Sequence, residues 1–484
     1  MQNLNFLTFL LSINPPSPSE IIGTGTSPRG KRGFKRNALI LKLVVLMRLT
    51  QFFYSFFVRK AIFEAIFKKS YMSKTDAGII ILFLSLLFPL AISACSNPEN
   101  KNSSVKAITA KTPITNDTIK PGARLPEKYL PLLKGKRVGL IANQTSLVKG
   151  EHLLDFLMRN EVDVVKIFSP EHGFRGNIER GKSFNAHTDE KTGLPIIPMY
   201  GNSRKPQAET LENVDILVFD IQDVGARFYT YISSMHLAME AAAENDKAFL
   251  VLDRPNPLGD YTDGPVLDLK YRSFVGMHPI PVVHGLTVGE LALMVNGEGW
   301  LANEAACKLT VIPCENYNHS DAWHLKVKPS PNLPNDVSVR LYPSLCFFEA
   351  TQVSIGRGTE FPFQLIGYPD SSLGAFSFTP KDMPGVQMNP VQENQKCYGT
   401  DLRESSLDTQ FTLKYLIQFN DALKNKGIKM ISNPRWFNLL AGNDKLLRQI
   451  NDGKSEQEIK ASWQAELEAY KAMRKKYLLY PDFE

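Results

Sequence analysis

VDVVKIFSPEHGFRG, residues 162–176, is the stretch that decides the fold. Its apolar run has the length and the β-branched content of a buried strand, and it stops at Ser169. Glu171, His172 and Arg175 follow at once in a glycine-punctuated turn. Parallel α/β sheets keep their ligand-binding side chains at the carboxyl ends of the strands. We therefore expect a parallel sheet with a polar site at this strand end.

Two later stretches repeat the pattern of an apolar run followed by polar residues. They are VDILVFDIQDVGARFYTY, residues 214–231, and AFLVLDRPNPLGD, residues 248–260. Three consecutive strand ends are then expected to meet in one cleft. The polar residues that follow these two runs are Asp220, Asp223, Arg227, Tyr229, Asp253, Arg254 and Asn256.

The surrounding sequence alternates strand-like and helix-like segments. A strand at 138–142 ends at Asn143, a helix is expected over 150–162, and further helices are expected around 233–244 and from Thr287. This alternation predicts an α/β, Rossmann-like, mostly parallel sheet with helices on both faces. Thr287 and Glu290 form a capping-box pattern, with His284 just ahead of it.

A proline-rich joint, PSPNLPND, separates this region from a loop-rich and then helical one. We therefore expect a Rossmann-like catalytic domain at 121–335 and a smaller C-terminal α+β auxiliary domain at 336–484. The helical spacing of the apolar residues after Thr412 supports a helical end to the second domain.

The N-terminal region has the features of a leader. Residues 72–95 combine Lys74, an apolar run and the sequence ISAC, which is typical of a lipoprotein signal peptide ending at a lipidated Cys95. Residues 1–71 would then be a start assigned too far upstream; the alternative is a basic amphipathic segment on a membrane surface. Residues 96–120 are expected to be a flexible tether, which places the protein in the cell envelope, lipid-anchored at the periplasmic face or the cell surface.

The positive charge of the chain belongs to this leader. The net charge is +7, but residues 1–94 hold 12 Lys+Arg and 3 Asp+Glu, a net of +9, which leaves −2 for the rest. A nucleic-acid partner is therefore not expected. The later cysteines, which include Cys307 and Cys314, show no zinc spacing; we favour buried thiols, with a Cys307–Cys314 disulfide as the alternative.

One motif match is misleading. Residues 176–183, GNIERGKS, fit the phosphate-binding pattern GxxxxGK[ST], but they neither follow a strand directly nor open a helical pattern. The sequence contains neither a dinucleotide GxGxxG nor a serine-hydrolase GxSxG motif. We expect no nucleotide, no cofactor and no metal.

Each candidate residue also has a structural interpretation. Glu171 fits a general acid, or a loop residue that pairs with Arg175. The group around Asp220 fits a ligand site, or an Asp–Arg pair that fixes a turn. Residues 349–360, EATQVSIGRGTE, place Glu349 and Arg357 near flexible glycines, and could equally form a tight hairpin. The scattered histidines, expected to be packed or solvated, are His236, His278, His319 and His324.

Taken together, the motifs resemble one bacterial family, the exo-β-N-acetylmuramidases, long catalogued as a domain of unknown function. The resemblance spans 121–483 and is carried by KRVGLIANQTS, FSPEHGFRG, VFDIQDVGARFYTY, LDRPNPLGD, PSPNLP, FEATQVSIGRGTEFPF and YLLYPDF. It implies release of N-acetylmuramic acid (MurNAc) from the non-reducing end of peptidoglycan fragments, with Glu171 as the leading catalytic candidate.

Glycoside hydrolysis needs a protonated carboxyl at the leaving oxygen, and a second carboxylate or the substrate's acetamido group at the anomeric carbon. We hypothesise that Glu171 is the acid and that Asp223 or Asp253 orients the acetamide or a water. Arg227, Arg254 and Arg357 are candidates for the lactyl carboxylate of muramic acid. The other expected contacts to a MurNAc-GlcNAc fragment are Asn143, His172, Arg175, Tyr229, Asn256, His284 and Glu349.

Two other functional classes fit parts of the sequence. A lipid-anchored, non-catalytic muropeptide-binding protein would use the same arginines and aromatic residues. A phosphate-handling enzyme would need Lys182 of the motif match. Carboxylates clustered at strand ends favour the hydrolase.

Overall fold

The computed structural model describes residues 118–175, 186–201 and 204–484. The expected leader, signal peptide and lipidated Cys95, nearly all of the tether and the motif match at 176–183 lie outside these residues. Among the described residues, no helix combines the length and the apolar character needed to cross a membrane.

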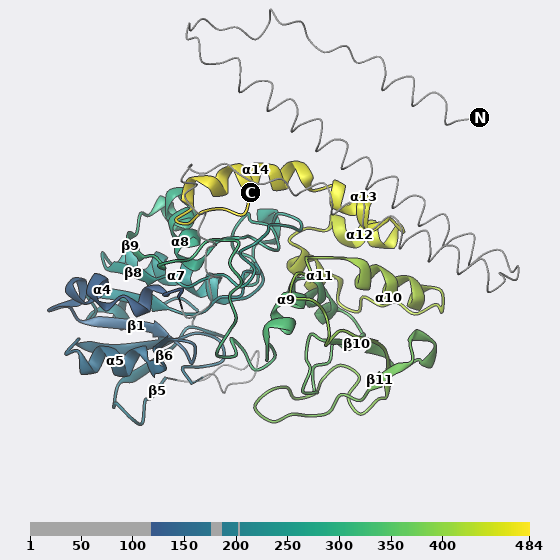
Figure 1. Cartoon of the computed structure of the whole chain (residues 1–484), viewed down its shortest axis with the longest axis horizontal. Helices are drawn as coiled ribbons and strands as arrows, with labels where there is room; N and C mark the ends of the chain where they lie inside the picture. Colours follow the sequence, from purple (N-terminus) through teal and green to yellow (C-terminus); the bar gives the residue numbers. More distant parts are fainter. Residues whose placement is uncertain (1–117, 176–185, 202–203) are drawn as a thin grey trace, which may run out of the picture. The chain divides into compact units, whose positions relative to one another are not determined.

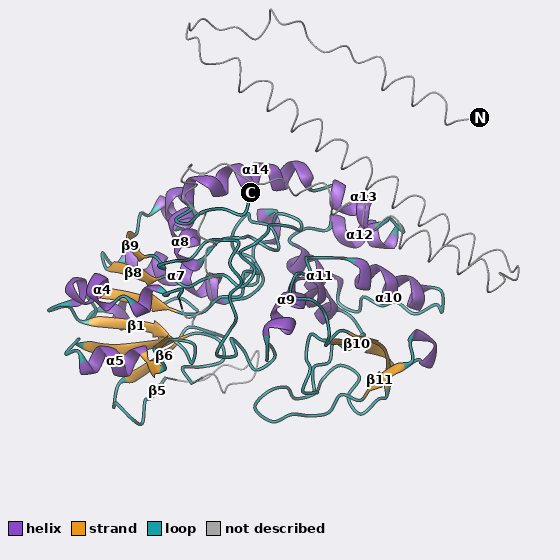
Figure 2. Ribbon diagram, viewed as in Figure 1, coloured by secondary structure: helices purple, strands orange, loops and turns teal. Residues whose placement is uncertain are grey.

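The first half of the described chain is built on a seven-stranded sheet of order β5-β6-β4-β1-β7-β8-β9 (Figure 2). Its strands are parallel except β5, which pairs antiparallel with β6. The expected mostly parallel α/β fold is therefore confirmed. The strands are β1 Val138–Ala142, β4 Val164–Ser169, β5 His187–Thr188, β6 Pro195–Pro198, β7 Ile216–Asp220, β8 Ala248–Leu252 and β9 Lys308–Ile312.

Helices cover both faces of this sheet because its central strands are apolar on both sides. In β1, every residue is buried; Leu140 packs into one core and Ile141 into another. The first core includes α4 Pro126–Leu133 and α5 Leu153–Arg159. The second includes α7 Tyr231–Glu244 and α8 Val288–Gly297. Alternating side chains of one strand thus hold both helical layers.

The strand order reverses at β1. The chain moves from β1 outward to β4 and β6, and then returns to add β7, β8 and β9 on the other side. At such a switch point the connections leave in opposite directions, which opens a crevice beyond the carboxyl ends of the strands. Asn143, Glu171 and Asp223 all follow strands that meet there.

Some local structure differs from the sequence-based expectation. The helix expected from 150 begins only at Leu153, because Glu151–His152 pairs as β3 with β2 Leu147–Val148 and the His152 side chain caps the helix. Strands β5 and β6 were not predicted from the sequence, because they are short and lack an apolar alternation. The Thr287–Glu290 capping box is confirmed.

The second half begins with α9 Asp336–Leu345, capped by Asn335. It contains an antiparallel sheet of order β10-β12-β11 and a run of helices that ends in α14 (Figure 1). The bounds are β10 Leu365–Tyr368, β11 Phe376–Phe378, β12 Cys397–Asp401, α10 Lys414–Lys424, α11 Pro434–Ala441, α12 Lys445–Asn451, α13 Glu456–Ala461 and α14 Gln464–Arg474, with α6 at Ala208–Leu211 in the first half. Short 3-10 helices cover Gly122–Arg124, Leu269–Tyr271, Ala302–Glu304, Cys346–Ala350, Ser371–Leu373 and Lys475–Tyr477.

The two halves share a continuous hydrophobic core. Phe228 of the first half makes edge-to-face contacts with Tyr342 and Phe347 of the second, at centroid distances of 5.1 and 5.9 Å. The four cysteines within the described residues are buried thiols, as favoured from the sequence. The site between the halves is therefore held by packed side chains on both sides.

Candidate active site

A cavity of about 300 Å³ lies between the two halves, next to the switch point of the sheet. The first half contributes Glu171, His172 and Tyr229 from the connections after β4 and β7. The second half contributes Glu349 and Arg357. Five of the sequence-predicted site residues therefore line a single cavity, which is large enough for about one sugar unit and part of a neighbour.

Glu171 is held at the wall of this cavity by the turn that ends β4. His172 and Gly173 adopt left-handed conformations, with φ of 73° and 79°. A left-handed backbone is uncommon for a residue with a side chain, and such strain gathers at functional sites. Glu171 is only 6% exposed, and its Oε2 accepts a hydrogen bond of 2.7 Å from Thr230 Oγ1. The turn thus positions one partly shielded carboxyl group.

A buried polar group lies beside Glu171. Burial raises the pKa of the Tyr231 phenol, and the charges of Glu171 and Asp223 add to this shift. One oxygen of Asp223 accepts from the Gly225 amide at 2.7 Å, and the other finds no hydrogen-bond donor in the described part of the chain. His284 Nε2 lies 3.7 Å from Asp223. This incompletely satisfied group is the kind of arrangement expected at a functional site.

The two tyrosines after β7 have different roles. Tyr229 lines the cavity, whereas Tyr231 packs behind it at a centroid distance of 4.7 Å. Both phenols donate to the carbonyl of Pro329, at 2.8 and 3.0 Å. Pro329 belongs to the PSPNLP joint, which supplies Asn332 to the cavity wall. The strand-end residues therefore hold the wall in place.

Glu349 and Arg357 form a mutual ion pair of 2.5 Å. Arg357 also stacks over Phe363, at 4.9 Å from the ring centroid. Gly356 and Gly358 on either side of it are left-handed, so the segment is the tight turn that was one of its two interpretations. Both side chains line the cavity, but the positive charge of Arg357 is already neutralised.

Arg227 lies outside the cavity lining, which corrects its predicted role in substrate binding. Its guanidinium is fully buried and donates to the carbonyls of Pro265, Ile280, Leu440 and Ala441, at 2.7–2.9 Å. Burial lowers the pKa of this group to about 9. Arg227 therefore ties α11 of the second half to loops of the first.

Asp253 is also corrected, from a catalytic to a structural residue. It is fully buried and accepts hydrogen bonds from Thr287 Oγ1, the Gly289 amide and Tyr480 Oη, at 2.7, 2.7 and 2.5 Å. Burial raises the pKa of its carboxyl to about 6. Its oxygens cap α8 and anchor the C-terminal segment, and Asp253 is not among the residues that line the cavity.

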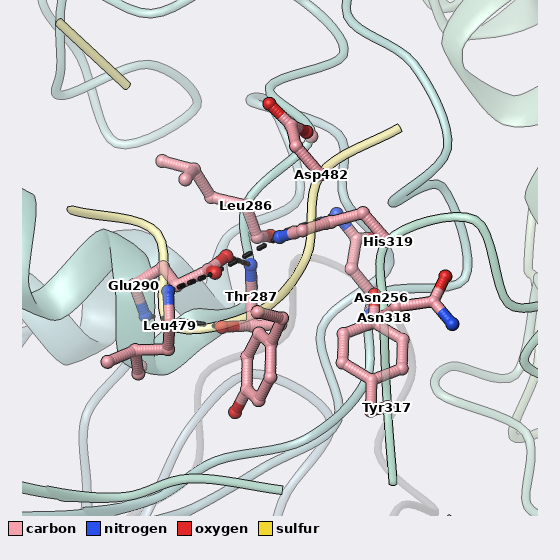
Figure 3. A network of polar contacts seen from close by, with 12 residues as sticks. Asn256, Leu286, Thr287, Glu290, Tyr317, Asn318, His319, Leu479 and Asp482 are labelled. Atoms are coloured by element: carbon pink, nitrogen blue, oxygen red, sulfur yellow. Dashed lines mark hydrogen bonds and ion pairs between the residues drawn. The ribbon is translucent and has the colours of Figure 1, made fainter. Parts of the chain in front are cut away.

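A second buried network adjoins this anchor (Figure 3). Glu290 Oε1 accepts from the Leu479 amide at 2.9 Å and pairs with His319 Nε2 at 3.0 Å. Its other oxygen accepts from the Thr287 amide at 2.9 Å. Glu290 and His319 are both fully buried, so this pair holds the C-terminal segment against the N-terminal half.

Four more predicted contacts are occupied elsewhere. Arg254 makes a bidentate pair with Asp220, with its Nε 2.6 Å from Oδ1, which is the structural alternative considered for Asp220. Arg175 pairs with Asp189 at 2.8 Å. The Asn256 side chain donates to Leu286 O and accepts from the Leu258 amide. Asn143 follows β1 and accepts from Thr145, and none of these four side chains lines the cavity.

The histidines follow the structural expectation. His236 and His278 are buried with their ring nitrogens 3.0 Å apart, and His324 is exposed and lies 2.8 Å from Asp336. No cluster of His, Cys, Asp and Glu among the described residues is arranged to bind a metal ion.

The sequence gave no signal for several residues that the cavity contains. Arg204 and Tyr200 lie in an irregular segment after β6, and Trp436 comes from α11. Asn332 is 2% exposed; its Nδ2 donates to Val386 O at 3.1 Å, and its Oδ1 is buried with no donor in the described ranges. Only Asn332 carried a hint, as one of the two amides in the proline-rich joint.

Comparison with known proteins relates this architecture to one family. The family model for the N-terminal part of exo-β-N-acetylmuramidase NamZ matches residues 138–337, and the model for its C-terminal part matches 340–480. A Bacillus subtilis protein named peptidoglycan β-N-acetylmuramidase NamZ is 38% identical over 426 residues, which cover 83% of this chain and 99% of that protein.

Two crystal structures of DUF1343 family proteins from Bacteroides fragilis share the fold. The first is 48% identical with a TM-score of 0.69, and the second is 30% identical with a TM-score of 0.65. Each match covers 75% of this chain and 99% of the other. Together with the two family models, which span most of the described chain, these relatives show that the chain belongs to the exo-β-N-acetylmuramidase NamZ family.

Proposed function

We propose that the protein is an exo-acting glycoside hydrolase that releases N-acetylmuramic acid from the non-reducing end of peptidoglycan fragments during cell-wall turnover. The relative from Bacillus subtilis carries the name of this activity. The observation that supports a catalytic site is Glu171, a shielded carboxyl on the wall of a sugar-sized cavity. A passive muropeptide-binding protein would not need a carboxyl placed in this way.

In this proposal Glu171 acts as the general acid. Its proton passes to the glycosidic oxygen as the bond from that oxygen to the anomeric carbon breaks, and the leaving sugar departs as an alcohol. The hydrogen bond from Thr230 Oγ1 to Oε2 orients the carboxyl at the cavity wall. Water completes the reaction at the anomeric carbon.

Asp223 supports the site without contacting the cavity. It lies close enough to Tyr229 and Tyr231 for its charge to add to the burial that raises the pKa of both phenols. Both phenols donate to the carbonyl of Pro329, which holds them in place. We assign Asp223 a positioning role, and the group that assists at the anomeric carbon is the substrate's own acetamide or Glu349.

The experiment compares two leaving groups on wild type and Glu171→Gln. A β-muraminide with an alkyl or sugar leaving group needs the acid, whereas a dinitrophenyl leaving group departs without it. Glu171→Gln should lose about 10²- to 10⁴-fold in kcat on the first substrate and much less on the second. Equal losses on both substrates, or no loss, would contradict the acid role.

We also propose that the protein is held in the cell envelope by a lipid on Cys95, after removal of residues 72–94. The support is the order of charge, apolar run and ISAC in the sequence. Cells expressing the protein should incorporate labelled palmitate into it, and Cys95→Ala should abolish the label. Labelling that survives the substitution would refute this anchor.

A further inference from the structure

The charged side chains on the cavity wall differ in whether they form ion pairs. Glu349 and Arg357 neutralise each other through their ion pair. Arg204 also lines the cavity, yet it makes no ion pair with any residue that the structure describes. It is exposed, and its guanidinium carbon lies 4.6 Å from the centroid of the Phe274 ring. Among the described residues, Arg204 is therefore a cation on the cavity wall without a neutralising partner.

We propose that Arg204 binds the carboxylate of the lactyl group that distinguishes muramic acid from N-acetylglucosamine, an assignment that rests on the proposed function. A guanidinium that lies over an aromatic ring keeps its edge of N–H groups free for an anion. A carboxylate accepts two parallel hydrogen bonds from that edge. Phe274 would hold Arg204 in place for this contact.

The stack that supports Arg204 continues beyond Phe274. Tyr200 lines the same cavity, with its ring centroid 5.8 Å from that of Phe274. Two aromatic rings thus back one guanidinium on the cavity wall. This arrangement limits the conformations that Arg204 can take, which lowers the entropy lost when it binds a ligand.

The other arginines near the strand ends are already engaged. Arg227 donates to four buried carbonyls, and Arg254 is paired with Asp220. Arg357 is neutralised by Glu349. A substrate carboxylate entering the cavity would bring a negative charge that these paired arginines do not offset. Arg204 can offset that charge.

The test measures the affinity for N-acetylmuramic acid and for its neutral lactyl methyl amide, by competition against a chromogenic β-muraminide. Wild type should prefer the acid. Arg204→Gln should weaken binding of the acid by about 10- to 100-fold and leave the amide unchanged, because a charge-assisted hydrogen bond is lost. Arg204→Lys should recover part of the preference, since it restores charge but not the paired N–H groups.

Arg159 offers a matched control. It is an exposed arginine over a phenylalanine ring, with its guanidinium carbon 5.3 Å from the Phe156 centroid, and it does not line the cavity. Arg159→Gln should leave both affinities unchanged. An undiminished preference for the acid in Arg204→Gln would overturn the assignment of Arg204.

The same experiment separates this inference from the function on which it rests. If wild type fails to hydrolyse the muraminide, the proposed function fails first. If wild type is active and Arg204→Gln keeps the wild-type preference for the acid, the proposed activity stands and the role of Arg204 is rejected. Higher salt should reduce the preference of wild type for the acid over the amide, because the ion pair between Arg204 and the lactyl carboxylate is solvent-accessible.

Discussion

Strands β4 and β8 end at the same edge of one sheet, yet the carboxylates that follow them have opposite fates. Glu171, after β4, lines a cavity and accepts a hydrogen bond from Thr230. Asp253, after β8, is fully buried and surrounded by donors from α8 and the C-terminal segment. A charged residue at a strand end thus indicates either chemistry or architecture, and the partners of its oxygens decide which.

The sharpest way to break this comparison is to neutralise the two carboxylates separately. Glu171→Gln should lower kcat on a sugar leaving group by about 10²- to 10⁴-fold and leave the urea unfolding midpoint near that of wild type. Asp253→Asn should lower the urea unfolding midpoint and leave the kcat of the folded fraction near that of wild type. Initial rates and urea unfolding on the same preparations measure both effects. Lost activity in a fully folded Asp253→Asn variant would return Asp253 to the catalytic site.

Arg227 extends the comparison to a cation. Arg227→Met should lower the free energy of unfolding by about 3–5 kcal/mol, because four buried carbonyls lose their donor. Denaturant unfolding provides the measurement. The KM of the folded fraction should stay unchanged, in contrast to that of Arg204→Gln. A raised KM with normal stability would mean that Arg227 contacts the substrate.

The pH dependence of stability should identify Asp253 as a buried carboxyl. Its pKa is about 6 in the folded protein against an ordinary value of 3.8, so the folded state binds the proton more tightly. The stability from this group is therefore present below about pH 4 and lost as the pH rises through 6. The advantage of wild type over Asp253→Asn should shrink by about 3 kcal/mol between pH 4 and 6.5. Unfolding curves of both variants test this, and parallel pH profiles would contradict it.

The smallest expected effect concerns the far end of the chain. Tyr480→Phe removes one hydrogen bond to Asp253 and one to the Cys314 amide, while keeping the ring contact with Tyr317. We expect a loss of about 1–2 kcal/mol in unfolding free energy and no change in kcat. Thermal unfolding measures the loss. A variant as stable as wild type would show that Asp253 needs no partner from this segment.

The part of this comparison that could be predicted from the sequence is the part with local signals. The apolar run before Ser169 predicted β4, and the glycine after it predicted the turn that carries Glu171. The alternation of strands and helices predicted the sheet. These predictions hold because burial on both faces leaves a continuous apolar pattern in the sequence.

The rest depended on contacts between distant residues. Asp253 was predicted to orient the acetamide or a water because its partner Tyr480 lies 227 residues away and leaves no local signal. Arg227 looked like a ligand because the carbonyls of Leu440 and Ala441 carry no sequence signal. Arg204 was missed because it lies in a segment with no periodic pattern. The partners of a charged residue, rather than its residue type, decide whether it lines the cavity or stabilises the fold.

The attachment of Leu479 and Tyr480 to the first half bears on how the molecule is made. Their hydrogen bonds to Glu290 and Asp253 span 189 and 227 residues of sequence. During translation the sheet emerges long before these partners do. The carboxylates of Asp253 and Glu290 therefore lack these hydrogen bonds until that segment has been synthesised. Contacts of such long range slow folding, and we expect a late kinetic phase in which the C-terminal segment closes over β8 and α8.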